Sequence, residues 1–241
     1  MKEISSIILF ISLFVMACTP AQKEQNQLTI DEQKAGWSLL FDGKSLNGWH
    51  LYNKGDMDSK WTVNNGELVC DPQKKEGVFG DLITDSAYED FDLQLEWKVT
   101  KGGNSGVFIN VKEDSVYAAT FATGLEMQLL DNTNAEARHQ TDSTHWAGCL
   151  YAVDCISQNS SPYTYGNWNS SRIVQENGKV SFWLNNKLTF ERETRNEDFK
   201  QMIKTSGMKA YPAFATYPSG QIALQNHTDS VAFRNIKIRR L

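Results

Sequence analysis

The sequence is short of the features that mark several common classes of protein. Lysine and arginine number 24 against 29 aspartates and glutamates, so no excess of positive charge is available for a nucleic-acid surface. The four cysteines do not have the spacing of a zinc site. A phosphate-binding loop, a dinucleotide fingerprint, a nucleophile elbow and a zincin motif are all missing from the sequence. We therefore expect no nucleic-acid partner, no metal and no cofactor.

The one long apolar run lies at the N-terminus and is too short for a permanent membrane span. It ends in Val15-Met16-Ala17-Cys18, which is typical of a bacterial lipobox, where the cysteine is lipidated and becomes the first mature residue. The alternative is an ordinary signal peptide cleaved nearby. We expect a lipoprotein signal peptide over residues 1–17, lipidation of Cys18 and a polar tether over residues 18–33. The protein would then be lipid-anchored in the cell envelope, on the periplasmic or the outer-surface face, and touch the membrane only through that anchor.

Strand patterns dominate residues 34–241, which we expect to form one domain. Residues 91–99 alternate between apolar and polar side chains, with Phe91, Leu93, Leu95, Trp97 and Val99 on one face. Similar patterns cover residues 107–111, 180–184 and 187–191. Many short antiparallel strands with little helix predict an all-β jelly-roll sandwich of two antiparallel sheets.

Three local features refine this prediction. Asn185-Asn186 lies between two strand patterns and predicts a hairpin turn, since asparagine tolerates positive φ. The apolar phase of the last strand shifts by one residue near Arg234-Asn235, which indicates a β-bulge. Residues 197–205 form the only segment with a helical pattern.

Cys149 and Cys155 could form a disulfide in an exported protein, which would leave Cys70 free.

Two of the strand-like segments carry chemically active side chains on one face. Glu126 and Gln128 alternate with leucine and methionine, and Gln225 and His227 alternate with Ile222 and Leu224. Glu126-x-Gln128-x-x-Asp131 has the spacing of the laminarinase-type retaining glycosidases. Its middle acid is an amide here, so a double displacement by two carboxylates is not expected. Alternatively, these are ordinary polar residues on a solvated strand face.

Other polar and aromatic residues are weaker candidates. His227 has the ordinary pKa best suited to proton transfer at neutral pH, although a lone histidine often has only a structural role. His139, Asp142 and His145 have a spacing that matches no common metal site, and Asn104 precedes a strand and could reach a sugar hydroxyl. Candidates for stacking on a sugar ring are Trp146, Tyr151, Trp168 and Tyr217, against the alternative of core or rim packing.

These motifs together give the chain a resemblance to the family of 3-keto-disaccharide hydrolase domains. The resemblance covers most of the chain after the tether. It includes WSLLFDG at 37–43, LNGW at 46–49, NSGVF at 104–108, LEMQLLDN at 125–132, THWAGCLY at 144–151, IALQNH at 222–227 and FRNIKI at 233–238. Two positions depart from the family pattern: Asn226 stands where an aspartate is usual, and Cys149 where a small residue is usual.

The resemblance implies a concanavalin-like jelly roll that cleaves glycosides already oxidised at C3 of the sugar. A C3 ketone acidifies the C2 proton, so a base can remove that proton, the C1 substituent can leave, and water can add to the enone. Glu126 and His227 would be the catalytic pair, in either order of acid and base. Substrate contacts would come from Asn104, Gln128, Asp131, His145, Tyr151 and Gln225. A non-catalytic carbohydrate-binding module is the alternative.

Overall fold

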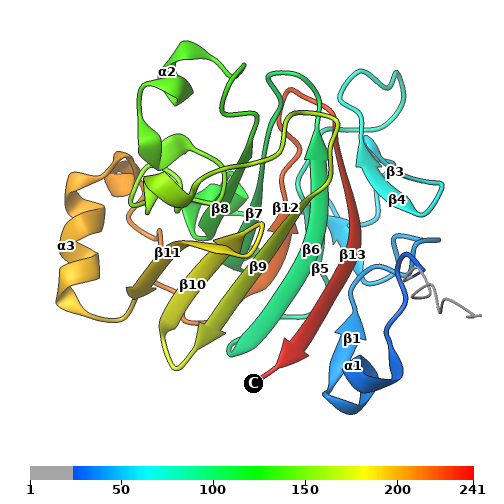
Figure 1. Cartoon of the computed structure of the whole chain (residues 1–241), viewed down its shortest axis with the longest axis horizontal. Helices are drawn as coiled ribbons and strands as arrows, with labels where there is room; N and C mark the ends of the chain where they lie inside the picture. The colour runs from blue at the N-terminus through cyan, green and yellow to red at the C-terminus, as the bar shows by residue number, and fades with distance from the viewer. Residues whose placement is uncertain (1–23) are drawn as a thin grey trace, which may run out of the picture.

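Two antiparallel sheets make up most of the computed structural model, which describes residues 24–241 (Figure 1). The large sheet has the strand order β11-β10-β9-β6-β13-β4-β3, with β1 also paired to β13. The small sheet has the order β2-β5-β12-β7-β8. Apolar side chains of both sheets meet in one core, so the predicted all-β sandwich is confirmed.

The bounds of the elements are as follows. The strands of the large sheet are β1 (Trp37–Leu39), β3 (Trp61–Asn64), β4 (Glu67–Cys70), β6 (Phe91–Val99), β9 (Asn169–Glu176), β10 (Lys179–Leu184), β11 (Lys187–Glu193) and β13 (Val231–Arg240). Those of the small sheet are β2 (Trp49–Leu51), β5 (Leu82–Thr84), β7 (Asn104–Val111), β8 (Leu125–Leu130) and β12 (Gln221–Leu224). Short helices are α1 (Ile30–Lys34), α2 (Ala137–Gln140), α3 (Glu197–Thr205), η1 (Thr120–Ala122), η2 (Ser143–His145), η3 (Ser157–Asn159) and η4 (Gly207–Ala210).

The central strand β6 shows why the sequence pattern predicts the sandwich. Its alternate apolar residues, including Leu93, Leu95 and Trp97, are buried against the small sheet. The polar residues between them point outward, and β6 is paired on both sides, to β9 and β13. Trp97 donates a hydrogen bond of 2.9 Å from Nε1 to Ser171 Oγ on β9, which satisfies its polar atom inside the core.

The hairpin turn, the β-bulge and the helix at residues 197–205 are also confirmed, but α3 is not the only helix, since α1 and α2 were not predicted. Asn185 and Asn186 have φ angles of 48° and 66°, as a two-residue turn between β10 and β11 requires. The pairing of β13 with β6 shifts register between Arg234 and Lys237, around Asn235 at φ 54°. The helix α3 covers the predicted residues, and the Asn196 side chain caps it.

Part of the predicted tether is structured. Asn26 is buried and exchanges two hydrogen bonds with Asn235 at the bulge of β13, and Thr29 and Glu32 form a capping box on α1. Residues 26–33 therefore belong to the folded part of the chain rather than to a flexible tether. The predicted signal peptide and the lipidation site at Cys18 lie outside the described residues. Within residues 24–241, no helix has the length and apolar character needed to cross a membrane.

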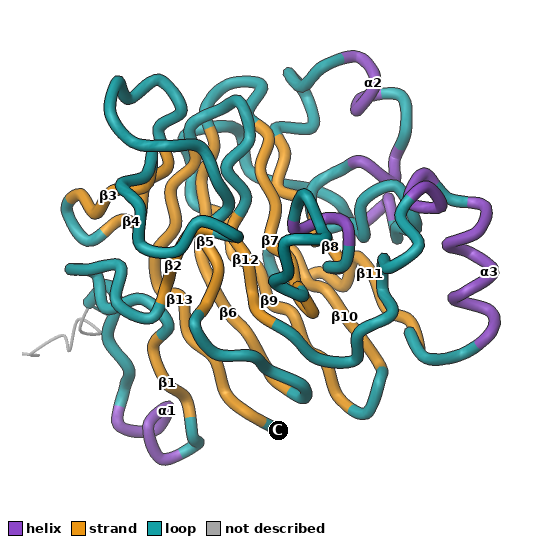
Figure 2. The backbone as a smooth tube through the Cα atoms, turned by 180° about the vertical axis from the view of Figure 1, so that it is seen from behind, coloured by secondary structure: helices purple, strands orange, loops and turns teal. Residues whose placement is uncertain are grey.

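Loops run over the outward face of the small sheet, whereas the outward face of the large sheet is largely bare of them (Figure 2). The covering segments are the chain between β7 and β8, the chain between β8 and β9 and the chain between α3 and β12. The small-sheet face is therefore the one that can be shaped into an enclosed pocket.

Candidate functional site

The small sheet brings the two polar clusters of the sequence together. Glu126 on β8 is opposite Phe108 on β7, and Gln128 is opposite Gly106, so all four lie on the outward face. Gln225 continues β12 beside them, with its backbone N–H bound to the Gly106 carbonyl at 2.9 Å. Any Cβ at position 106 would collide with the Glu126 carboxyl group. Glycine at this position makes room for that carboxyl group.

A pocket of about 190 Å³ opens above this face. Five of the residues predicted to act in the site line it, namely Asn104, Glu126, Tyr151, Gln225 and His227. The other lining residues are Phe121, Arg138, His139, Met208 and Tyr211, which the sequence reasoning did not assign to the site. A second hollow of about 240 Å³ shares Asn104, His139 and His227 with it. Because the 190 Å³ hollow holds both residues predicted to be catalytic, Glu126 and His227, we call it the catalytic pocket.

The surroundings of Glu126 favour its protonated form. Its side chain is buried, and no described residue hydrogen-bonds to its carboxyl group. Burial raises its pKa well above the ordinary value, and the nearby Asp81 carboxylate raises it further. Burial also raises the pKa of Asp81, although hydrogen bonds from the Thr120 hydroxyl and from the Asn226 backbone N–H at 2.9 Å oppose that rise. No such hydrogen bonds oppose the rise at Glu126, so its pKa is the more strongly raised of the two.

The two histidines of the pocket are neutral. Burial lowers the pKa of His227, whose Nδ1 lies 3.0 Å from the Thr228 hydroxyl. Burial also lowers the pKa of His139, to about 4, and the Arg138 charge adds to the effect. The Nε2 of His139 lies 3.4 Å from the Asn104 amide nitrogen. The catalytic pocket thus offers a carboxylic acid that can donate a proton and an imidazole, His227, that can accept one.

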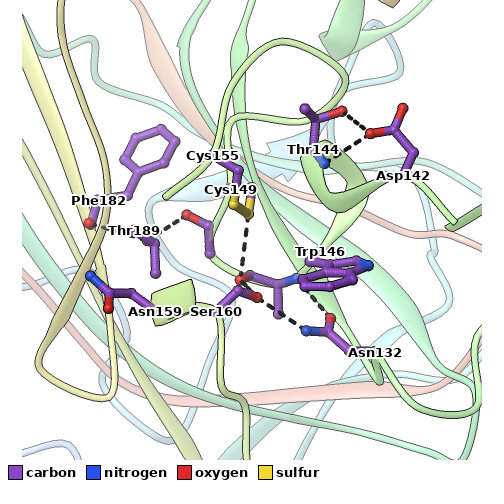
Figure 3. The surroundings of a disulfide bond; sticks show 12 residues. Asn132, Asp142, Thr144, Trp146, Cys149, Cys155, Asn159, Ser160, Phe182 and Thr189 are labelled. Carbon is purple, nitrogen blue, oxygen red and sulfur yellow. Dashed lines mark hydrogen bonds between the residues drawn. A yellow bond between two sulfur atoms is a disulfide. The ribbon is translucent and has the colours of Figure 1, made fainter. Parts of the chain in front are cut away.

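The loop that carries Tyr151 is held in place by a disulfide between Cys149 and Cys155, so the bridge left open by the sequence is present (Figure 3). Thr189 on β11 donates to the Gly148 carbonyl at 2.6 Å and ties this loop to the large sheet. The Tyr151 ring stacks on His145 with centroids 4.6 Å apart. His145 therefore supports a wall of the pocket from behind.

Three residues predicted to bind substrate do not line the catalytic pocket. Gln128 is 1% exposed and lies within the sheet face next to Glu126. Asp131 accepts hydrogen bonds from Gly102 N–H at 2.9 Å and from the Asn134 amide at 2.8 Å, so it organises a turn. His145 lies behind Tyr151, as described above. Because none of the three lines the pocket, we assign them supporting positions rather than direct contact with a ligand.

The predicted stacking residues also separate. Tyr151 lines the catalytic pocket, but Trp146 donates a hydrogen bond to the His139 carbonyl at 3.1 Å and packs behind it. Trp168 lies on the large sheet between the Lys98 and Arg234 cations. Tyr217 borders a different groove, described below.

Most of the buried polar atoms that lack a partner among the described residues surround this site. They are both amide atoms of Gln128, Nδ1 of His139, Oε1 of Gln225 and both amide atoms of Asn226, with Arg239 Nε the exception elsewhere. Such atoms cost free energy unless water or a ligand satisfies them. Their concentration marks this sheet face as a place built for something other than stability.

The described residues contain no group of three or more histidine, cysteine, aspartate or glutamate side chains arranged to hold a metal ion. His139 and His145 contact each other edge to face, with centroids 5.2 Å apart. His139 instead forms part of the pocket wall, and His145 supports Tyr151.

Comparison with known proteins places these features in context. The model of the 3-keto-alpha-glucoside-1,2-lyase-like domain matches residues 36–239. A 3-keto-disaccharide hydrolase of Bacteroides thetaiotaomicron is 31% identical over 245 residues, covering 92% of this chain and 83% of the relative.

Two solved structures from Parabacteroides distasonis, both assigned to the glycosyl hydrolases, are also similar. The first has a TM-score of 0.82 at 32% identity and covers 90% of this chain and 100% of its own. The second has a TM-score of 0.66 at 27% identity and covers 85% of this chain and 99% of its own. The match therefore extends over the sheets and the loops that form the site.

Proposed function

Because the chain belongs to the 3-keto-alpha-glucoside-1,2-lyase-like family and is a carbohydrate-cleaving enzyme, we propose that it cleaves 3-keto-glycosides by elimination followed by hydration. The observation that carries this proposal is the pairing of a protonated carboxyl group, Glu126, with a neutral imidazole, His227, in one pocket. Elimination from a 3-keto sugar needs one acid and one base, and this pocket supplies both.

In the proposed reaction, His227 removes the C2 proton of the bound 3-keto sugar. The electron pair of the C2–H bond forms the enolate of the C3 ketone, and the C1–O bond then breaks as the double bond forms between C1 and C2. Glu126 donates its proton to the departing glycosidic oxygen, so the aglycone leaves as an alcohol. The amides of Asn104 and Gln225, which line the same pocket, are placed to donate hydrogen bonds to the enolate oxygen.

Hydration completes the cleavage. Water adds its oxygen to C1 of the enone and returns a proton to C2, which leaves a free 3-keto sugar with a hydroxyl group at C1. After elimination, the proton from C2 is on His227, where it exchanges with solvent, and Glu126 is ionised. The same pair can then deliver a solvent-derived proton to C2 and accept one from water. The net change is hydrolysis without a covalent bond between sugar and protein.

The proposal is tested by incubating the purified protein with a 3-keto-disaccharide and with the same disaccharide bearing a C3 hydroxyl group. We expect release of two sugars from the first substrate and none from the second, because only the ketone acidifies the C2 proton. Equal cleavage of both substrates, or cleavage of the plain disaccharide alone, would contradict the elimination mechanism.

We also propose that the enzyme is exported and anchored by lipid at Cys18, on the basis of the lipobox at residues 15–18. In a host that processes lipoproteins, wild-type protein is expected in the membrane fraction and Cys18→Ser in the soluble fraction. Identical fractionation of the two proteins would rule out lipidation.

A further inference from the structure

A groove of about 790 Å³ lies beside the catalytic pocket. Its apolar lining comes from α3 and the segment that follows η4, namely Ile203, Tyr211, Pro212, Phe214, Tyr217 and Pro218. Figure 1 shows α3 at the edge of the molecule next to β11. We call this hollow the α3 groove.

The α3 groove and the catalytic pocket share a wall. Tyr211 lines both of them, and its ring meets Phe121, another pocket residue, edge to face at 5.2 Å between centroids. Met208 lines the pocket, and the next residue, Lys209, lines the groove. A ligand that extends out of the pocket past Tyr211 therefore enters the groove.

The size of the catalytic pocket requires such an extension. At about 190 Å³ it is smaller than the roughly 300–1,000 Å³ typical of sites that enclose a whole small molecule. A single sugar ring would occupy it, and the group attached at C1 would lie outside. The neighbouring groove, at about 790 Å³, is large enough to receive that group.

The aromatic walls of the α3 groove are fixed before any ligand arrives. The Tyr217 hydroxyl lies 2.8 Å from the Tyr117 hydroxyl, and the two rings meet edge to face. Phe214 is 3% exposed and cannot reorient freely. Rigid aromatic surfaces suit a flat ring, because little conformational freedom is lost on binding.

The rim of the groove is positively charged. Its lining includes Arg195, Lys200, Lys204 and Lys209 and no acidic residue from the described part of the chain. Arg195 and Lys200 form ion pairs outside it, with Glu89 at 3.4 Å and Glu197 at 2.6 Å. Lys204 and Lys209 form no ion pair with the described residues. An anionic group in the groove would therefore meet Lys204 and Lys209 with no acidic residue in the lining to compete for them.

We propose that the α3 groove binds the aglycone of the substrate, and that this aglycone is an aromatic ring bearing a carboxylate or a similar anionic group. The inference rests on the proposed function, since it places the 3-keto sugar in the catalytic pocket. The flat apolar walls select the ring, and Lys204 and Lys209 select the charge.

The test uses three 3-keto-glucosides, with 4-carboxyphenyl, phenyl and glucosyl groups at C1. For each one, kcat/KM is measured for the wild type, the double variant Lys204→Gln/Lys209→Gln and the control Lys44→Gln, an exposed lysine before β2 and outside both hollows. Ratios between variant and wild type cancel the different reactivity of the three leaving groups.

We expect the double variant to lose about three- to tenfold more kcat/KM on the 4-carboxyphenyl substrate than on the phenyl substrate, as two weak charge contacts would give. Tyr217→Leu should lower kcat/KM more for both aryl substrates than for the disaccharide, and Tyr217→Phe, which keeps the ring, should show a smaller difference. Lys44→Gln should match the wild type.

Equal losses on all three substrates would overturn the inference about the groove while leaving the proposed function intact. Failure of the wild type to cleave any 3-keto-glucoside would overturn the proposed function instead. In that case the dissociation constant of the uncleaved 4-carboxyphenyl glucoside, compared by calorimetry between wild type and double variant, still decides whether the groove recognises the anion.

Discussion

Both sheets carry polar side chains on their outward faces, but the two faces differ in whether those side chains have partners. On the large sheet the charges are paired: Asp92 accepts two hydrogen bonds of 2.8 Å from Arg172, and Glu96 accepts one of 2.6 Å from Arg234. Lysine and arginine side chains there also lie over Trp37, Trp168 and Trp183. On the small sheet Glu126 has no such partner, and Gln128, Gln225 and Asn226 retain unsatisfied atoms.

Cavity size does not distinguish the two faces. The large sheet has an outward cleft of about 410 Å³, more than twice the volume of the catalytic pocket at about 190 Å³. The charged groups that line that cleft are already paired, Glu96 with Arg234, Arg172 with Asp92 and Lys237 with Glu32. They therefore have little left to offer a reacting molecule. In this fold the site is therefore marked by buried polar atoms without partners and by titratable side chains that favour their uncharged form. Surface polarity and cavity volume do not mark it.

The largest effects are expected from removing the proposed acid and base of the small-sheet face, with an acidic residue of the large-sheet face as the control. Glu126→Gln and His227→Ala should each lower kcat on a 3-keto-disaccharide by about 10²–10⁴, the usual contribution of general acid–base catalysis. Glu96→Gln on the large sheet should leave kcat within about twofold of the wild type. Melting temperatures check that all variants fold. Full activity of either small-sheet variant would contradict the claim that the small-sheet face carries the catalytic groups.

The buried histidine of the small-sheet site should also make the protein sensitive to acid. The pKa of His139 is about 4 in the folded protein, against an ordinary value of 6.5. Its contribution to stability is therefore intact above pH 6.5 and is lost as the pH falls toward 4, by about 3 kcal/mol in all. Urea unfolding of wild type and His139→Leu at pH 7 and pH 4.5 measures this loss, which should be smaller in the variant.

His50 provides a control of opposite sign. Burial lowers its pKa, but hydrogen bonds to Glu113 and Asp85 raise it more, so the net shift is upward. Its contribution is present below pH 6.5 and is lost as the pH rises through the folded-state pKa. An acid loss that persists unchanged in His139→Leu would contradict the assignment to His139.

The pH dependence of kcat/KM should sharpen the assignment of acid and base. Activity requires neutral His227 and protonated Glu126, so it should rise through a pKa below 6.5 and fall above the raised pKa of Glu126. Below the lower pKa and above the higher one, it should change about tenfold per pH unit, and between them it should level off. The residual activity of Glu126→Gln should lack the fall at high pH. A fall that is unchanged in this variant would assign the acid to another group.

The smallest effect is expected at the paired charges of the large sheet. Lys98 and Glu67 are 2.9 Å apart and partly exposed, and Lys98 lies over the Trp168 ring. Lys98→Met should change the free energy of unfolding by less than about 1 kcal/mol and leave kcat unchanged. Denaturant melts and steady-state kinetics check both. A large loss of activity would show that this face takes part in function.

The sequence predicts the sandwich well because burial of one strand face imposes a period of two, which β6 displays along its whole length. It does not predict how completely a polar position is covered. Asp92 is outward in that alternation, yet it is only 1% exposed, because Arg172 and Arg239 cover it.

The site is predicted in part for the same reason. Glu126 and His227 are found from alternation on β8 and after β12, and the structure places both in one pocket. His139 reaches the site from the short helix α2, and Asp81 directly precedes β5. Neither segment is long enough to show a periodicity that would reveal where its side chains point. Gln128 shares a face with Glu126 and is nevertheless covered, since the packing of distant loops decides which part of a sheet face stays open.

The central claim, that cleavage begins with removal of the C2 proton, is tested most directly by turnover of a 3-keto-disaccharide in D₂O. Elimination followed by hydration breaks the C2–H bond and returns a proton from solvent. The account therefore predicts one deuterium at C2 of the released 3-keto sugar, seen by proton nuclear magnetic resonance as loss of the C2 signal in early product. Full retention of the C2 proton in a sugar released at the wild-type rate would contradict it.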